Sequence, residues 1–251
     1  MARQIGTGKI QGTLGDITFY RSRDGLMAKL KSTVSADRIA TDPAYARTRE
    51  NGQEFGRAAK AGKLIRSAFS SVLSQIADNR MTSRLVQAVK FAQNEDTESE
   101  RGKRNIITGN ASLLEQFEFN DKSPFSATFM AEFLADVDRA KGLATVDTKA
   151  FIPAKSINVP DGATHFKLFS AAAEINFESG SVLRTSITTP EIELGLQLQP
   201  AINLVQQLSL NSMDHIMIVL GIEFYQKFNG RFYPLNNGSA NAVTMARVDM
   251  P

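Results

Sequence analysis

The sequence contains no cysteine, and this absence excludes several kinds of chemistry at once. A chain without thiols forms no disulfide, no thiolate metal site, no cysteine nucleophile and no redox switch. Histidine is almost as rare, since His165 and His215 are the two imidazoles in 251 residues. We therefore expect no metal centre built from several histidines, and the sequence implies no cofactor.

Long apolar runs are also missing. No stretch approaches the roughly 20 consecutive apolar residues of a membrane-spanning helix. The first residues, MARQIGTGKIQGTLG, lack the apolar core of a signal peptide. We expect no membrane span and synthesis in the cytosol, from which the protein could still enter a virion or an extracellular assembly. With 42% hydrophobic and 22% charged residues, the composition excludes a wholly disordered chain.

Positive charge is concentrated near the N-terminus, although the whole chain carries a net charge of only +3. Lys and Arg outnumber Asp and Glu by 13 to 6 in residues 1–70, against 10 to 12 in 71–150 and 6 to 8 in 151–251. Such an asymmetry leaves two interpretations open. The N-terminal segment contacts a polyanion, or it packs against acidic surfaces of neighbouring subunits.

Residues 1–41 are predicted to form a glycine-rich, basic β-hairpin arm. Four glycines, Gly6, Gly8, Gly12 and Gly15, precede the β-branched and aromatic run 17–20. Asp24-Gly25 is a strong turn signal, and apolar residues alternate with Met27, Lys29 and Lys31 on the return strand. Residues 32–41 are expected to be irregular.

Residues 42–104 are predicted to form a helical hairpin followed by a charged connection. Asp42-Pro43 is a typical helix start, and apolar residues then recur every three or four positions up to Ile76. Phe55 belongs to this predicted buried face. Gly52, Gly56 and Gly62 suggest that another backbone approaches closely. Residues 94–104 contain no hydrophobic residue, so we expect an exposed connection and a domain boundary there.

Residues 105–251 are predicted to form an antiparallel β-sandwich of eight to ten strands, because the apolar period changes to two. The alternating runs are Phe125–Phe133, Ile192–Leu198 and Ile216–Phe224, and the alternation slips near Ser170 as it would at a β-bulge. Asn229-Gly230 predicts a tight turn into 231–233. The predicted fold class is thus mainly β with an α-helical insertion.

No motif for catalysis is recognisable. The glycines around Lys9 lack the spacing and the preceding strand of a phosphate-binding loop, and no nucleophile elbow occurs. His165 and His215 are each expected to be strand-end residues bonded locally, and Asp136 and Asp138 to lie in a solvated turn. Two glycosylation patterns begin at Asn110 and Asn237, and without a secretory signal we interpret both as accidental. We therefore expect no enzyme and no small-molecule substrate.

The basic arm is the most suggestive feature of the sequence. Its cations could bind phosphates while an aromatic ring stacks on bases, or the arm could add to a neighbouring subunit's sheet. The candidate residues for assembly or polyanion contact are Phe19, Tyr20, Arg21, Arg23, Lys29 and Lys31.

The opening motif Gly8-x3-Gly12-x2-Gly15-x-Ile17-x-Phe19-Tyr20, the Gly25 turn, and the Thr41-Asp42-Pro43 entry into an Arg-rich helix resemble an uncharacterised family of Bacteroidota proteins. Members of that family open with a glycine-punctuated hairpin, followed by helices and a β-rich remainder. The resemblance covers about the first 75 residues. It implies a fold but no activity, and it assigns no functional residue.

Together these features predict a non-enzymatic structural subunit that assembles with copies of itself, as in a virion, tube, fibre or appendage. The alternative is a nucleic-acid-binding protein that uses the basic segment. In both cases the partner is a macromolecule, either the protein itself or a nucleic acid.

Overall fold

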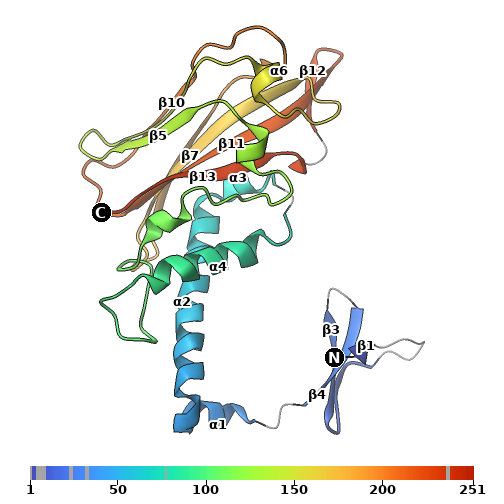
Figure 1. Ribbon diagram of the computed structural model, residues 1–251, viewed down its shortest axis with the longest axis vertical. Coiled ribbons are helices and arrows are strands. Elements are labelled where there is room, and N and C mark those ends of the chain that lie inside the picture. The colour runs from blue at the N-terminus through green and yellow to red at the C-terminus, as the bar shows by residue number, and fades with distance from the viewer. Residues whose placement is uncertain (1, 4–9, 23–24, 32–33, 77, 236–237) are drawn as a thin grey trace. The chain divides into compact units, whose positions relative to one another are not determined.

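The computed structural model describes residues 2–3, 10–22, 25–31, 34–76, 78–235 and 238–251. The chain forms two compact units, Met1–Asn51 and Gly52–Pro251. Strands in three antiparallel sheets dominate, accompanied by a few helices (Figure 1), which confirms the predicted fold class.

The first unit contains a four-stranded antiparallel sheet rather than a simple hairpin. Its strands are β1 (Ala2–Arg3), β2 (Gly12–Leu14), β3 (Ile17–Ser22) and β4 (Gly25–Leu30), in the order β1-β4-β3-β2. The predicted hairpin corresponds to β3 and β4. Gly15 has φ +56° in the turn from β2 to β3, a backbone conformation that glycine adopts without strain. Asp24, Gly6 and Gly8 lie outside the described residues.

Residues 32–41 are not irregular throughout, because α1 (Ala36–Thr41) forms there. The sequence signal is the cap Ser35, whose side chain accepts a hydrogen bond from the Arg38 amide at 3.1 Å. The predicted helix start is confirmed in part. Asp42 accepts a hydrogen bond from the Ala44 amide at 2.9 Å, but it caps the short 3-10 helix η1 (Pro43–Tyr45) that precedes α2 (Ala46–Ala68).

In the second unit, α2 packs with α3 (Ser70–Leu73) and α4 (Met81–Asn94) over a shared apolar core. The predicted close approach occurs at Gly62, where an added Cβ would lie 3.2 Å from the Val86 side chain of α4. Gly56 has no such neighbour. The prediction of a buried Phe55 is wrong, since this side chain is 56% exposed and Glu54 is buried in its place.

Residues 94–104 lie within the second unit and are not simply an exposed connection. Asp96 is buried, and its carboxylate accepts hydrogen bonds from the amides of Ser99 at 2.9 Å and Asn105 at 3.1 Å. Burial alone raises the pKa of Asp96, but hydrogen bonds from Thr108, Ser99 and Asn105 outweigh it and hold the pKa well below its usual range. The polar composition therefore reflects a hydrogen-bonded loop.

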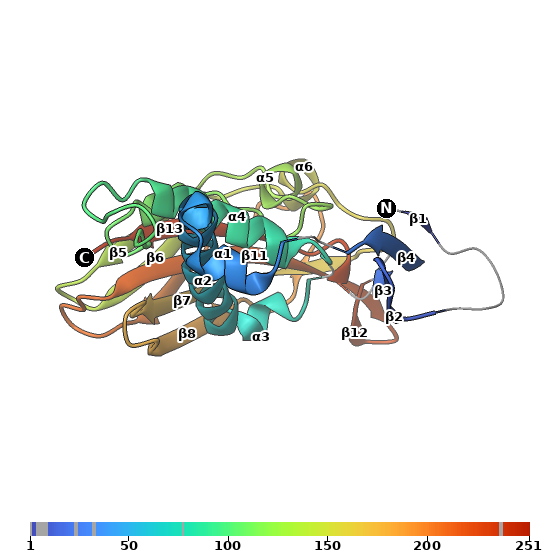
Figure 2. The same cartoon turned by 90° about the horizontal axis from the view of Figure 1, so that it is seen from below.

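The second unit has three layers, with helices on one face of a six-stranded sheet and a three-stranded sheet on the other face (Figures 1 and 2). The large sheet comprises β7 (His165–Ile175), β8 (Val182–Thr188), β9 (Ile192–Glu193), β11 (His215–Phe228), β12 (Arg231–Pro234) and β13 (Ala242–Asp249). The small sheet comprises β5 (Phe133–Asp138), β6 (Leu143–Thr148) and β10 (Asn203–Gln207). Among the described residues this makes nine strands after Leu113, within the predicted range.

Strand β11 separates two apolar cores. Ile218 and Leu220 face the small sheet, whereas Met217 and Val219 face the helices. The predicted strand over 215–225 is confirmed, as is the turn into β12, where Asn229 and Gly230 have φ +47° and +74°. The sequence indicated one buried face, but both are buried because the sheet is covered on each side.

The predicted strand over Phe125–Phe133 is wrong in part. Residues Phe125–Thr128 form the short helix α5, and β5 begins only at Phe133. Phe125 and Phe129 are buried with their ring centroids 5.4 Å apart. Spacings of four suit one helical turn as well as alternate strand positions, so the apolar pattern did not distinguish the two.

Two further strand features differ from the prediction. The run Ile192–Leu198 forms only the two-residue β9, and Leu196 and Leu198 are 74% and 66% exposed. No bulge lies at Ser170, because β7 pairs with β11 in uninterrupted register from His165 to Ile175. The register shift occurs instead between β11 and β13, at Ile218/Val219. The apparent slip near Ser170 arises because both faces of β7 are buried.

Three short helices complete the second unit: η2 (Ala111–Leu114), α5 and α6 (Pro153–Ser156). Asn110 accepts a hydrogen bond from the Ser112 amide at the start of η2, so the first glycosylation-like triplet serves as a helix cap. Asn237 of the second triplet lies outside the described residues.

Candidate functional site

The two faces of the N-terminal sheet differ sharply in chemistry. Residues paired across antiparallel strands share a face, so Leu14, Ile17 and Leu30 lie together, as do Phe19 with Ala28 and Arg21 with Leu26. The opposite face carries Thr13, Thr18, Tyr20, Ser22, Met27 and Lys29. One face is therefore apolar except for Arg21, and the other is mixed and largely polar. We call the first set the apolar face.

The apolar face is open to solvent at the end formed by Leu14, Ile17 and Leu30, whereas Phe19, Leu26 and Ala28 are half-buried. Leu14 is 67% exposed, Ile17 41% and Leu30 77%. None of the residues of the first unit whose burial is described is fully buried. A sheet normally hides one face against another layer, which makes this uncovered face a candidate contact surface.

The structure divides the candidate residues predicted from sequence between the two faces. Phe19 and Arg21 lie on the apolar face, whereas Tyr20 and Lys29 lie on the opposite face, with the Lys29 amine 5.5 Å from the Tyr20 ring centroid. Lys31 follows β4, and its amide donates a hydrogen bond to the Asp16 carbonyl at 2.7 Å. Arg23 lies outside the described residues. Arg21 and Lys29 thus do not form one basic surface.

The histidines differ from each other. His165 starts β7, with Nδ1 2.9 Å from the Thr164 hydroxyl, which confirms the expected local bond. His215 starts β11 and is 4% exposed, and its Nε2 has no hydrogen-bond partner among the described residues. Burial, followed by the charge of Arg139, lowers the pKa of His215. The expected local hydrogen bond is therefore missing at Nε2 of His215 among the described residues.

The prediction that Asp136 and Asp138 lie in a turn is wrong, because both belong to strand β5, and the turn that follows is solvated only in part. Asp138 pairs with Lys141 at 2.8 Å on the surface. Arg139, however, binds the Asp249 carboxylate at 2.5 Å and the Asp214 carbonyl at 3.1 Å. It therefore ties the β5–β6 turn to β13 and to the start of β11. The sequence could not show these contacts of Arg139, because Asp214 and Asp249 lie 75 and 110 residues further along the chain.

Metal-binding clusters and membrane-spanning helices are two features that the described residues lack. Among these residues, no group of three or more histidine, aspartate or glutamate side chains is arranged to hold a metal ion. No helix in the same part of the chain is both long and apolar enough to cross a membrane.

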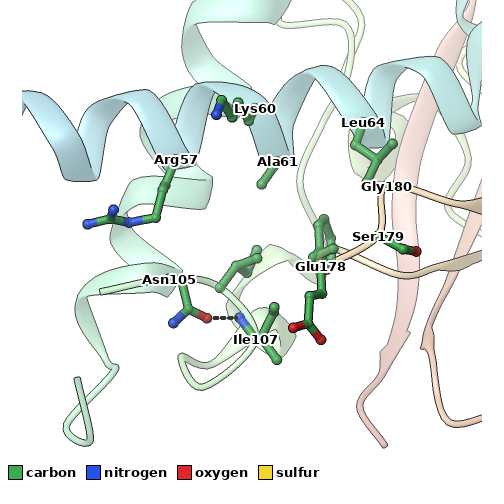
Figure 3. A pocket seen from close by; sticks show the side chains of 11 residues that line it. Arg57, Lys60, Ala61, Leu64, Asn105, Ile107, Glu178, Ser179 and Gly180 are labelled. Atoms are coloured by element: carbon green, nitrogen blue, oxygen red, sulfur yellow. Dashed lines mark hydrogen bonds between the residues drawn. The ribbon is translucent and has the colours of Figure 1, made fainter. Parts of the chain in front are cut away.

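A cavity of about 360 Å³ lies between α2, the loop at 105–107 and the turn after β7. Ala61, Leu64, Ile106 and Phe177 contribute apolar walls, while Arg57 and Lys60 lie on the α2 side. In Figure 3 the head groups of Arg57 and Lys60 do not converge with Glu178 on the opposite wall. The Arg57 guanidinium also donates a hydrogen bond to the Arg104 carbonyl at 2.8 Å. This cavity therefore lacks the convergent polar groups that orient a ligand.

A second cavity of about 290 Å³ lies where β7, β8 and β11 meet α3. Several polar side chains converge there, among them Lys167, Glu223 and Tyr225. The sequence does not show this cluster, because Lys167 lies far along the chain from Glu223 and Tyr225. Only the pairing of β7 with β11 brings them together. The alternation of polar residues at the end of β11 was the available signal.

No protein-family model, curated protein or solved structure matches this chain. The resemblance drawn from the N-terminal motif therefore stays a prediction, and no relative supplies a function. The function of the protein has to be inferred from the geometry of its described residues.

Proposed function

We propose that the protein is a structural subunit that assembles with copies of itself through the apolar face of the N-terminal sheet. The observation that carries this proposal is the exposure of Leu14, Ile17 and Leu30 on a sheet in which no residue of described burial is fully buried. Leaving large apolar side chains in water forgoes about 1.5–3 kcal/mol each. A second layer that covers this face recovers that free energy.

A second copy is the partner whose chemistry fits best. An apolar face is complementary to an identical apolar face, as a contact between two copies related by a two-fold axis requires. Strands β3 and β4 have six residues each, and the sheet has four strands. At about 3.4 Å per residue and 4.8 Å between strands, one face measures at most about 400 Å².

This area has a consequence for the kind of assembly. Stable interfaces bury about 800 Å² per partner, so one pair of faces supplies about half of that. A weak pairwise contact becomes effective when many subunits are linked. Two copies that cover each other's apolar face leave no such face free, so this contact alone gives a weak dimer, and a larger assembly needs a second contact surface.

The runner-up function, nucleic-acid binding, receives less support from the geometry. Phosphate contacts require cations on one surface. Arg21 and Lys29 lie on opposite faces of the sheet. Tyr20 and Lys29 do share a face, but their cation–π contact uses both groups within the sheet.

A pair of neighbouring substitutions tests the proposal. Ile17→Glu places a charge on the apolar face, whereas Thr18→Glu places the same charge on the opposite face of the same strand. We expect Ile17→Glu to abolish higher oligomers in light scattering over a concentration series, and Thr18→Glu to assemble like the wild type. Equal effects of the two variants, or assembly that survives Ile17→Glu, would contradict the proposal.

A further inference from the structure

The cavity between β7, β8, β11 and α3 brings several polar side chains together, unlike the cavity beside α2. Its volume is about 290 Å³, close to the lower end of ligand-binding pockets. Strand β8 supplies Ser186, Ile187 and Thr188, while Ser71, Val72 and Gln75 come from α3 and its end. Lys167, Phe169, Glu223 and Tyr225 form the remaining wall on β7 and β11.

Glu223 is the unusual group in this wall, because it is a carboxylate that is only 8% exposed. One of its oxygens accepts a hydrogen bond from the Tyr225 hydroxyl at 2.6 Å. Burial and this bond raise the pKa of Tyr225 above its ordinary value, so the hydroxyl keeps its proton and remains a donor at neutral pH. Tyr225 is a neutral partner, so this hydrogen bond brings no positive charge to Glu223.

Among the described residues, no ion pair joins Glu223 to a lysine or arginine side chain. Lys167 is its direct neighbour across the strands, but the lysine amine binds Glu191 at 2.8 Å and lies 5.0 Å from the Tyr225 ring centroid. The carboxyl groups of Glu191 and Glu223 therefore lie around a single lysine, Lys167. A buried carboxylate without an ionic partner is costly, and a cation that enters the cavity relieves this cost.

We propose that this cavity binds a primary ammonium group on an alkyl stem. The ammonium donates its protons to Glu223 and to the hydroxyl oxygens of Ser186 and Thr188, all of which can accept them. The alkyl stem lies against Val72 and Phe169. Aromatic faces also attract cations, which favours the same ligand beside Tyr225. An alkylammonium group occurs both in free polyamines and in lysine side chains.

Matched ligands and matched variants test this inference with the full chain. We expect n-butylamine to bind with a dissociation constant in the millimolar range, measured by protein NMR titration, and n-butanol and glycerol not to bind. Glu223→Gln keeps an acceptor for Tyr225 and removes the charge, so affinity should fall at least about tenfold, as for the loss of a hydrogen bond to a charged group. Glu98→Gln removes an exposed carboxylate that does not line the cavity and should leave affinity unchanged.

Several results would overturn the inference. These are binding of n-butanol or glycerol as strong as that of n-butylamine, equal affinity of Glu223→Gln and wild type, and no binding of n-butylamine. If Glu223→Gln does not fold, Ser186→Leu on the edge strand fills the cavity and must abolish the same binding. Because the site does not include the N-terminal sheet, failure here leaves the assembly proposal unaffected.

A last pair of ligands identifies the source of the ammonium group. Putrescine stands for a free diamine, and N-acetyl-lysine methylamide stands for a lysine side chain of a protein. Tighter binding of putrescine supports a polyamine ligand, whereas tighter binding of the lysine derivative supports a partner protein's lysine. Absence of binding by both compounds overturns the inference.

Discussion

The ring of Phe169 occupies the place where a side chain at position 221 would lie, which makes Gly221→Ala a sharp test of the packing. An alanine Cβ would be 2.1 Å from Cζ of Phe169 and 2.7 Å from both Cε atoms. Contacts below 3.0 Å force a movement, and the ring is held because Phe169 is 4% exposed within the helix-facing core. The substitution therefore overpacks the sheet rather than filling a void.

The expected cost follows from this geometry. Overpacking a well-ordered core costs about 1–3 kcal/mol. For a unit of this size, each kcal/mol lowers the melting temperature by about 2–4 °C. We therefore expect Gly221→Ala to melt about 2–12 °C below the wild type in thermal unfolding followed by circular dichroism.

Two controls make the test specific. Gly56→Ala lies inside α2 with open space around the added Cβ, so it should raise stability by about 0.5–1 kcal/mol. Combining Gly221→Ala with Phe169→Leu removes the obstructing ring, and the double variant should lose less than the two single effects added. A Gly221→Ala variant that melts with the wild type, or strictly additive effects, would refute the packing described for β7 and β11.

Two further predictions concern buried side chains of the second unit. Phe129→Asp should lower the free energy of unfolding by several kcal/mol, measured by chemical denaturation. The reason is that Phe129 is 3% exposed and its ring centroid lies 5.3 Å from that of Phe151. A variant as stable as the wild type would contradict the burial of Phe129. Burial lowers the pKa of His215, so the folded protein favours neutral imidazole, and wild-type stability should fall as the pH drops below about 6.5. His215→Phe should lose that part of the pH dependence, and an unchanged pH profile of melting temperature would show that His215 is not responsible.

The strands were predictable where the chain pairs locally. Alternation marked β3 and β4, and Asn229-Gly230 marked the hairpin of β11 and β12, because both signals depend on neighbouring residues. Phe125 and Phe129 were placed on a strand because positions four apart fit a helical turn equally well. Leu196 and Leu198 alternate as a strand does, yet they stay exposed since no neighbouring strand pairs with them.

The candidate surfaces were predictable to different degrees. The sequence pointed to the N-terminal arm as a contact segment, but it did not show that Arg21 and Lys29 face opposite sides of a four-stranded sheet. The Glu223 cavity could not be inferred, because Lys167 and Glu223 become neighbours through strand pairing over a long stretch of chain. Polar residues at a strand end normally indicate solvent exposure. Glu223 and Tyr225 line a cavity because α3 packs beside them.

Strand β11 links the two apolar cores of the second unit, although they lie in different layers. The same backbone carries Ile218 and Leu220 into one core and Met217 and Val219 into the other. Pulling the strand out of the sheet would therefore open both cores in one step. Such a shared strand makes unfolding an all-or-none event and leaves few partly open forms from which unwanted aggregation could start.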